Sequence, residues 1–187
     1  GPINYRAALV QPDAMDTLLA HHTSKVDEQD AVKTLEYARY LYYGSILSDH
    51  DALGAIHPNH TLAAQLAYTL AVQRWPTPIT IQDNDNPHEM RDKAASMLTT
   101  QPMPEEQAQI AASAAALLGL MYLRGEGVPQ DAEIASIWLA RASEAKDPLG
   151  MTSMIMMYLN GYGGPAKDEK KNRAYDHYVT QYLDIFH

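Results

Sequence analysis

Apolar residues recur along the chain with the spacing of α-helices. Between residues 27 and 43, Val32, Leu35, Ala38 and Leu41 lie three residues apart, so they share one face of a helix. A β-protein would instead need runs in which Val, Ile or Thr alternates with polar residues, and no such run of useful length is present. The pattern therefore predicts an all-α protein.

Capping residues and prolines set the bounds of the predicted helices. Gly44 is a typical left-handed residue after a helix, Asn59 or Thr61 can cap the next one, and Pro104 opens a helix whose first turn is acidic. The prolines between residues 75 and 103 indicate a connector with one extra helix. The predicted helices span 12–22, 27–43, 59–74, 87–99, 104–124, 131–145, 148–160 and 168–187.

An internal repeat is the strongest signal in the sequence. The segments 121–127 and 157–163 are identical at five of seven positions, and the offset between them is 36 residues. Asp131 and Asp168 follow the two segments, and Trp138 and Tyr175 each come seven residues after the Asp. A period of this length with a helix-turn-helix in each copy is typical of an α-solenoid.

The shared residues have physical roles that fit this interpretation. Gly125 and Gly161 end a helix, where we expect φ to be positive, and replacing either with Ala should cost about 1 kcal/mol or more. Asp131 and Asp168 are expected to cap the helices that follow. We expect Gly119 to admit a neighbouring helix closely. The aromatic pairs predicted to fill the space between paired helices are Tyr122 with Trp138 and Tyr158 with Tyr175.

The segment from Leu118 to Val128, followed by Asp131, Ala135, Trp138 and Ala142, resembles the Sel1-like repeat family. The second copy departs from the pattern, since Ile155 replaces the helix glycine. The resemblance divides one solenoid domain into a degenerate repeat at 27–74, the connector at 75–103, a clear repeat at 104–146, and a second repeat with a terminal helix at 147–187.

The resemblance implies a superhelix of paired helices that binds proteins without catalysis. Members of the family act as adaptors and regulators, often in bacteria and often exported. We therefore expect a protein or peptide partner and no cofactor.

Aligning the three copies predicts where a partner binds. One row contains Arg39, Leu120 and Met156, and the row four residues later contains Tyr43, Arg124 and Asn160. In stacked helix pairs the first helices line the concave side, so both rows should be exposed there, with Leu118, Tyr122, Met154 and Tyr158 in the core. On this hypothesis an acidic-to-neutral peptide lies along the rows. Leu120→Arg or Arg124→Glu should then abolish binding and leave the melting temperature nearly unchanged.

Composition and charge exclude some classes of binding partner. Hydrophobic residues make up 46% and charged residues 20% of the chain, which is a globular composition. Fourteen basic against 23 acidic residues give a net charge of −9, which argues against nucleic-acid binding. No apolar run is long enough to insert into a membrane. Without cysteine there is no disulfide, thiolate metal site or cysteine nucleophile.

A metal-dependent binder or enzyme is the alternative function. His50, His57 and His60, with Asp49 and Asp51, lie in one predicted loop and at the following helix start, and such side chains bind zinc or nickel. The other interpretation is a solvated polar loop, because ligands of a true site are usually fixed on regular structure. No nucleophile elbow, phosphate-binding loop or metalloprotease motif is present.

The two ends of the chain give further expectations. Gly1 and Pro2 resemble the remnant of a cleaved purification tag, and we exclude them. The absence of an initial methionine favours a removed export signal, hence a periplasmic or otherwise exported protein, with a cytoplasmic one as the alternative. The last helix is too apolar for a bare solenoid end. We expect it to pack back on its own repeat, to make an oligomer contact or to receive a further repeat.

Overall fold

The computed structural model describes residues 31–44, 58–76, 79, 103–161 and 169–186, with only the backbone for 169–174. These residues form helices and no strand, which confirms the all-α prediction for the described part. The predicted helices 12–22 and 87–99 lie outside it. The described helices are α3 (Ala31–Tyr43), α4 (His60–Ala71), α6 (Glu105–Arg124), α7 (Ala132–Glu144), α8 (Pro148–Leu159) and α9 (Glu169–Phe186).

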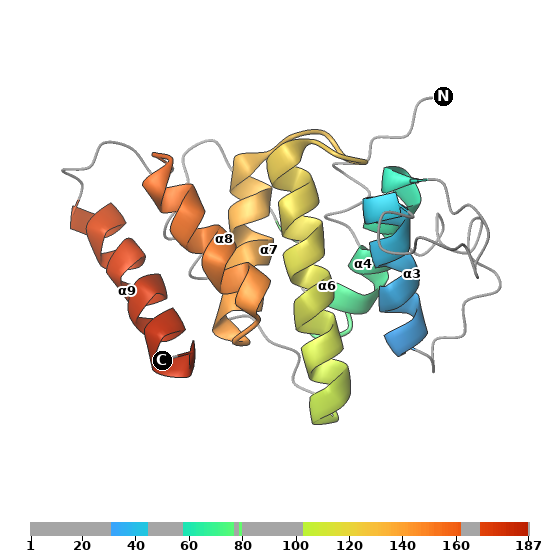
Figure 1. The fold of residues 1–187 in the computed structure, drawn as a ribbon, viewed down its shortest axis with the longest axis horizontal. Coiled ribbons are helices and arrows are strands. Elements are labelled where there is room, and N and C mark those ends of the chain that lie inside the picture. The colour runs from blue at the N-terminus through green and yellow to red at the C-terminus, as the bar shows by residue number, and fades with distance from the viewer. Residues whose placement is uncertain (1–30, 45–57, 77–78, 80–102, 162–168, 187) are drawn as a thin grey trace.

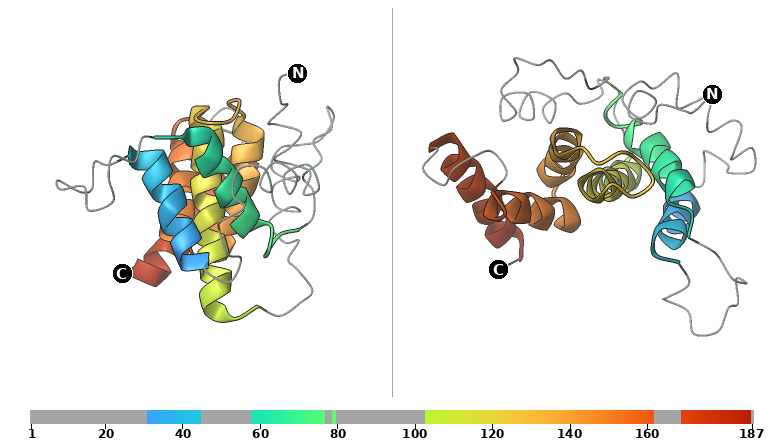
Figure 2. Two further views of the ribbon diagram at one scale, coloured as in Figure 1. Left: turned by 90° about the vertical axis from the view of Figure 1, so that its right-hand side faces the viewer. Right: turned by 90° about the horizontal axis from the view of Figure 1, so that it is seen from above.

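The helices stack in the order of the chain. Each contacts the next described helix, from α3 with α4 through to α8 with α9. Figures 1 and 2 show α3 and α4 at one end of the stack and α9 at the other. The helix α6 lies in the interior and contacts α3, α4, α7 and α8. This arrangement confirms the predicted α-solenoid.

The helix ends follow the predicted chemistry. Gly44, Gly125 and Gly161 have φ of 74°, 69° and 96°, so the expected left-handed conformation is confirmed at each. The Asn59 and Asp131 side chains accept hydrogen bonds from the backbone N–H groups of Leu62 and Ile134, both at 3.0 Å. Asp168, the corresponding cap of α9, lies outside the described residues.

One boundary differs from the prediction. The helix α4 ends at Ala71, three residues before the predicted end at residue 74, and the chain continues as a turn. The N–H groups of Arg74 and Trp75 both donate to the Ala71 carbonyl at 3.1 Å. Pro76 disfavours helical conformation in the residue before it, and the turn directs Trp75 into the core, where it is 1% exposed.

Close packing around α6 explains the small residues in the repeat. A β-carbon on Gly119 would lie 2.6 Å from the Leu139 side chain of α7, so the expected close approach of a neighbouring helix at this glycine is confirmed. Two further aromatic contacts join the helices: Trp138 lies edge-on to Tyr68 and Tyr158 stacks on Tyr178, each with ring centroids 6.0 Å apart. Trp138 thus joins α7 to α4, not only to the helix paired with it. The predicted pairs Tyr122 with Trp138 and Tyr158 with Tyr175 stay a prediction.

The terminal helix packs back on its own repeat through part of its length. Tyr178 is 2% exposed, so the predicted packing of the last helix on its own repeat is confirmed at this residue. Farther along, Leu183, Ile185 and Phe186 remain 39–49% exposed. The Phe186 ring contacts Tyr182, with centroids 4.9 Å apart. An oligomer contact at this end stays a prediction.

Candidate functional site

The predicted binding rows lie where the first helices of the repeats end. The helices α3, α6 and α8 all finish at the upper edge of the molecule in Figure 1. Tyr43, Arg124 and Asn160 stand at these three ends, and all are exposed. One turn earlier, Arg39 and Met156 are exposed as well. The expected exposure is therefore confirmed for five of the six row residues.

The exposure predicted for Leu120 is wrong. Its side chain is only 8% exposed and belongs to the hydrophobic core. The physical reason is the position of α6, which contacts helices on both sides. The face that carries the exposed Arg39 on α3 and Met156 on α8 is therefore covered on α6. Leu118, Tyr122, Met154 and Tyr158 are buried as predicted.

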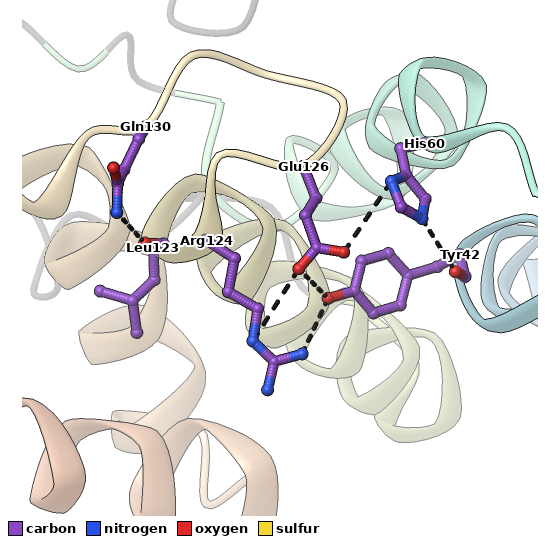
Figure 3. A network of polar contacts seen from close by, with 6 residues as sticks. All are labelled: Tyr42, His60, Leu123, Arg124, Glu126 and Gln130. Carbon is purple, nitrogen blue, oxygen red and sulfur yellow. Dashed lines mark hydrogen bonds and ion pairs between the residues drawn. The ribbon is translucent and has the colours of Figure 1, made fainter.

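Arg124 belongs to a polar cluster, defined here as Tyr42, His60, Arg124 and Glu126, which Figure 3 shows from close by. The Arg124 Nη1 donates to the Tyr42 hydroxyl at 3.1 Å, and that hydroxyl donates to Glu126 Oε1 at 3.1 Å. Arg124 Nε also lies 3.9 Å from Glu126 Oε1. The cluster thus connects α3 to the loop after α6.

Contacts and burial shift the pKa values of two members of this cluster, Tyr42 and Arg124. Burial raises the pKa of Tyr42, more than the nearby Arg124 lowers it, so its hydroxyl keeps the proton that it donates to Glu126. The hydrogen bond to Tyr42, together with the charge of Glu126, raises the pKa of Arg124. The Arg124 side chain is still 55% exposed, and a guanidinium carries five N–H donors, so donors remain for a partner.

His60 links the same cluster to the first turn of α4. Its Nε2 lies 3.1 Å from the Tyr42 backbone carbonyl, which can only accept, so Nε2 carries a proton. Its Nδ1 faces Glu126 Oε2 at 3.8 Å. Both ring nitrogens therefore face protein groups.

Of the histidines in the predicted metal loop, His50 and His57 lie outside the described residues. The residues that the structure describes contain no group of three or more side chains that could hold a metal ion.

The loop after α6 holds Glu126 in place through its backbone. The N–H of Glu126 donates to Met121 O at 3.0 Å and that of Asp131 to Tyr122 O at 2.9 Å, while Gln130 Nε2 donates to Leu123 O at 2.9 Å. These bonds satisfy carbonyls that the end of a helix leaves free.

Sequence reasoning missed Tyr42, His60 and Glu126 as neighbours of Arg124. Tyr42 and Glu126 are 84 residues apart, and no pattern in the chain links them. The only available signal was the alignment of repeats, which places residue 43 beside residue 124 in the second row.

Comparison with known proteins agrees with the repeat. The sequence pattern of the Sel1 repeat matches residues 112–147 and 149–178. No curated protein and no solved structure matches the chain significantly. Within the described residues, no helix combines the length and apolar character that crossing a membrane requires. The two matched segments lie within the stacked pairs formed by α6 with α7 and by α8 with α9, so residues 112–178 consist of two Sel1 repeats.

Proposed function

We propose that the chain is a non-catalytic adaptor or regulator that binds a peptide or protein segment across the ends of α3, α6 and α8. Sel1 repeats are generally protein–protein interaction modules. The observation that carries the proposal is the exposure of large apolar side chains at these ends: Tyr43 is 41%, Met156 51% and Leu159 59% exposed. Tyr and Met are enriched at binding surfaces, where their bulk gains most from burial.

Hydrogen-bonding groups accompany these apolar side chains. Arg124 presents the unused part of its guanidinium, Asn160 its amide and Arg39 a second positive charge, and all three are exposed. Such a mixture suits a peptide with apolar anchors and an acidic or neutral backbone segment. The contacts of Arg124 with Tyr42 and Glu126 fix the direction of its side chain before a partner arrives.

The experiment is a pull-down from the source organism followed by mass spectrometry, comparing the parent with Met156→Glu and Tyr43→Ser. We expect both variants to lose the partner and to melt within a few degrees of the parent, since both side chains are exposed. Val32→Glu is the matched control, because Val32 is 43% exposed at the other end of α3. Loss of the partner in the control, or its retention in both test variants, would contradict the proposal.

Leu120→Arg and Arg124→Glu would disturb the fold as well as the proposed binding surface. Leu120→Arg would place a charge in the core and unfold the protein. Arg124→Glu would set two carboxylates side by side and break the bond to Tyr42, so its effect on binding could not be separated from stability. Arg124→Gln is the milder choice because it keeps a donor.

Three further questions have their own tests: where the protein is located, whether it self-associates and whether it binds a metal. We propose an exported protein, which a signal peptide encoded at the start of the gene would support. A contact between copies through the end of α9 would be lost in Phe186→Glu, measured by sedimentation. Stoichiometric zinc in protein purified without a histidine tag would favour the histidine loop and contradict a metal-free module.

A further inference from the structure

A cavity of about 440 Å³ lies at the opposite end of α6 from the polar cluster. Its walls come from the turn after α4, the first half of α6 and the turn between α7 and α8. The polar groups that line it are Arg74, Glu105, Gln109, Ser113, Lys146 and Asp147, and three alanine side chains with Pro148 form the rest. None of the six row residues lines it.

The two cations of this cavity have no carboxylate partner in the part of the chain that the structure describes. Arg74 Nη1 donates to the Ala108 carbonyl at 3.1 Å, and its guanidinium lies over the Trp75 ring at 4.9 Å. Neither Arg74 nor Lys146 forms an ion pair with Glu105, which lines the same cavity. Burial lowers the pKa of Arg74, which shows that this charge has lost part of its hydration.

The carboxylate of Asp147, in the turn between α7 and α8, already accepts two hydrogen bonds. Asp147 Oδ1 accepts a hydrogen bond from the Ser113 hydroxyl, and Oδ2 accepts one from the Gly150 N–H, each at 3.0 Å. The Asp147 carboxylate therefore caps α8, and among the described residues it forms no ion pair with Arg74 or Lys146.

Lys146 occupies a backbone position that glycine normally takes. Its φ is 66°, and it is the one described residue other than glycine with a positive φ. The Lys146 N–H donates to Ser143 O at 2.9 Å and the Asp147 N–H to Ala142 O at 3.0 Å, which is the pattern of a Schellman cap. A lysine here carries a strain that glycine would avoid, and strained residues of this kind gather at functional sites.

We propose that this cavity binds a carboxylate, held between Arg74 and Lys146. A carboxylate accepts charge-assisted hydrogen bonds from both cations, and these bonds are stronger at the half-buried guanidinium than they would be in open water. The source is an acidic side chain or the C-terminus of a peptide, since both present the same group. Gln109 adds an amide at the rim for the neighbouring peptide bond.

The test titrates the ¹⁵N-labelled protein with three small probes at constant ionic strength. N-acetyl-glutamic acid α-amide carries a side-chain carboxylate, N-acetyl-alanyl-alanine a C-terminal carboxylate, and N-acetyl-alanyl-alanine amide none. We expect saturable shifts of the Gln109, Ser113 and Lys146 amide signals with at least one carboxylate probe and not with the amide. The tighter of the two carboxylate probes identifies the source.

Two variants of Lys146 make the test specific. Lys146→Gly removes the charge and relieves the backbone strain, so it should bind the carboxylate probe at least fivefold more weakly without melting lower than the parent. Lys146→Arg retains the charge and should retain the affinity. The proposal is overturned if neither carboxylate shifts these signals, if the amide shifts them equally, or if Lys146→Gly binds like the parent. Such a result leaves the proposed function intact, because the row residues lie elsewhere.

Discussion

At the scale of single residues, backbone conformation decides which substitutions the loops tolerate. Gly127 and Gly161 both have positive φ, at 78° and 96°, but their surroundings differ. A β-carbon on Gly127 would overlap the backbone carbonyl of His60, whereas nothing lies within 4 Å of the corresponding position on Gly161. The first glycine is required for close approach of two segments, the second only for its conformation.

Gly127→Ala is therefore expected to destabilise the protein more than Gly161→Ala does. For Gly161→Ala the cost is that of left-handed backbone alone, about 1–2 kcal/mol. Gly127→Ala adds displacement of the loop from the first turn of α4, so we expect a total above about 2 kcal/mol. Urea unfolding of the two variants measures the difference. Equal losses would mean that the loop can move away from His60 at no cost.

At the scale of elements, the polar cluster is a connection between repeats rather than within one. Tyr42 comes from α3, His60 from α4, and Arg124 and Glu126 from the end of α6, so three helices meet through side-chain contacts. The tyrosine hydroxyl is the central group because it accepts from Arg124 and donates to Glu126.

Tyr42→Phe removes both of these hydrogen bonds and keeps the ring in the core. We expect it to lower the free energy of unfolding by about 1–3 kcal/mol, because both bonds involve a charged partner and the Tyr42 side chain is buried. Tyr43→Phe is the matched control, since Tyr43 is exposed and, within the described part of the chain, its hydroxyl forms no hydrogen bond. In a double-mutant cycle, Tyr42→Phe and Glu126→Gln should show an interaction energy. Strict additivity would show that the bond between Tyr42 and Glu126 contributes no stability.

The turn between α7 and α8 should make stability depend on pH through Asp147. Burial raises the pKa of this carboxyl, although bonds from Gly150 and Ser113 and the charge of Arg39 lower it in part. The folded protein thus binds this proton more tightly than the unfolded chain does. The contribution of Asp147 to stability is therefore largest in acid and falls as pH rises through its folded pKa.

Asp147→Asn isolates this effect, because asparagine also caps helices and accepts from the Gly150 N–H. The stability of the parent relative to Asp147→Asn should decrease between about pH 3 and pH 7, as measured by chemical unfolding at each pH. Asp147→Ala should lose about 1 kcal/mol at either pH by comparison with Asp147→Asn. A parent that gains stability over Asp147→Asn with rising pH would show that the bonds to the carboxylate outweigh its burial.

At the scale of the whole molecule, we expect a change at one end of the stack to affect stability mainly at that end. The helix α9 packs on α8, and the bonds from Ser143 to Gln181 at 2.8 Å and between His177 and Glu144 at 3.0 Å add links to α7. In contrast, α6 contacts four helices. In such a stack, stability is approximately a sum of repeat and interface contributions.

Tyr178→Ala should therefore loosen only the end of the stack. The ring is 2% exposed and stacks on Tyr158, so its removal should cost about 3–5 kcal/mol locally. Amide hydrogen exchange should accelerate in α9 and the last turns of α8 while α6 keeps its protection. A uniform increase in exchange from α3 to α9 would instead show that the described part unfolds as one cooperative unit.

Local sequence was enough to predict the repeat, the described helices to within a few residues, and the caps at Asn59 and Asp131. Gly125, Gly161 and Asp131 act through their own backbone and the next few residues, so local chemistry suffices to place them. The rows of exposed residues were also largely predictable, because equivalent positions in a repeat take equivalent places on helices.

Features that depend on neighbours far away in the chain could not be predicted from local sequence. Leu120 occupies the same repeat position as the exposed Met156, yet α6 is enclosed by helices on both sides and buries it. Tyr42, His60 and Glu126 meet because successive repeats stack, and Arg74 and Lys146 line one cavity for the same reason. The sequence pattern specifies the face that a residue occupies on its own helix, whereas burial and contacts depend on which other helices cover that face.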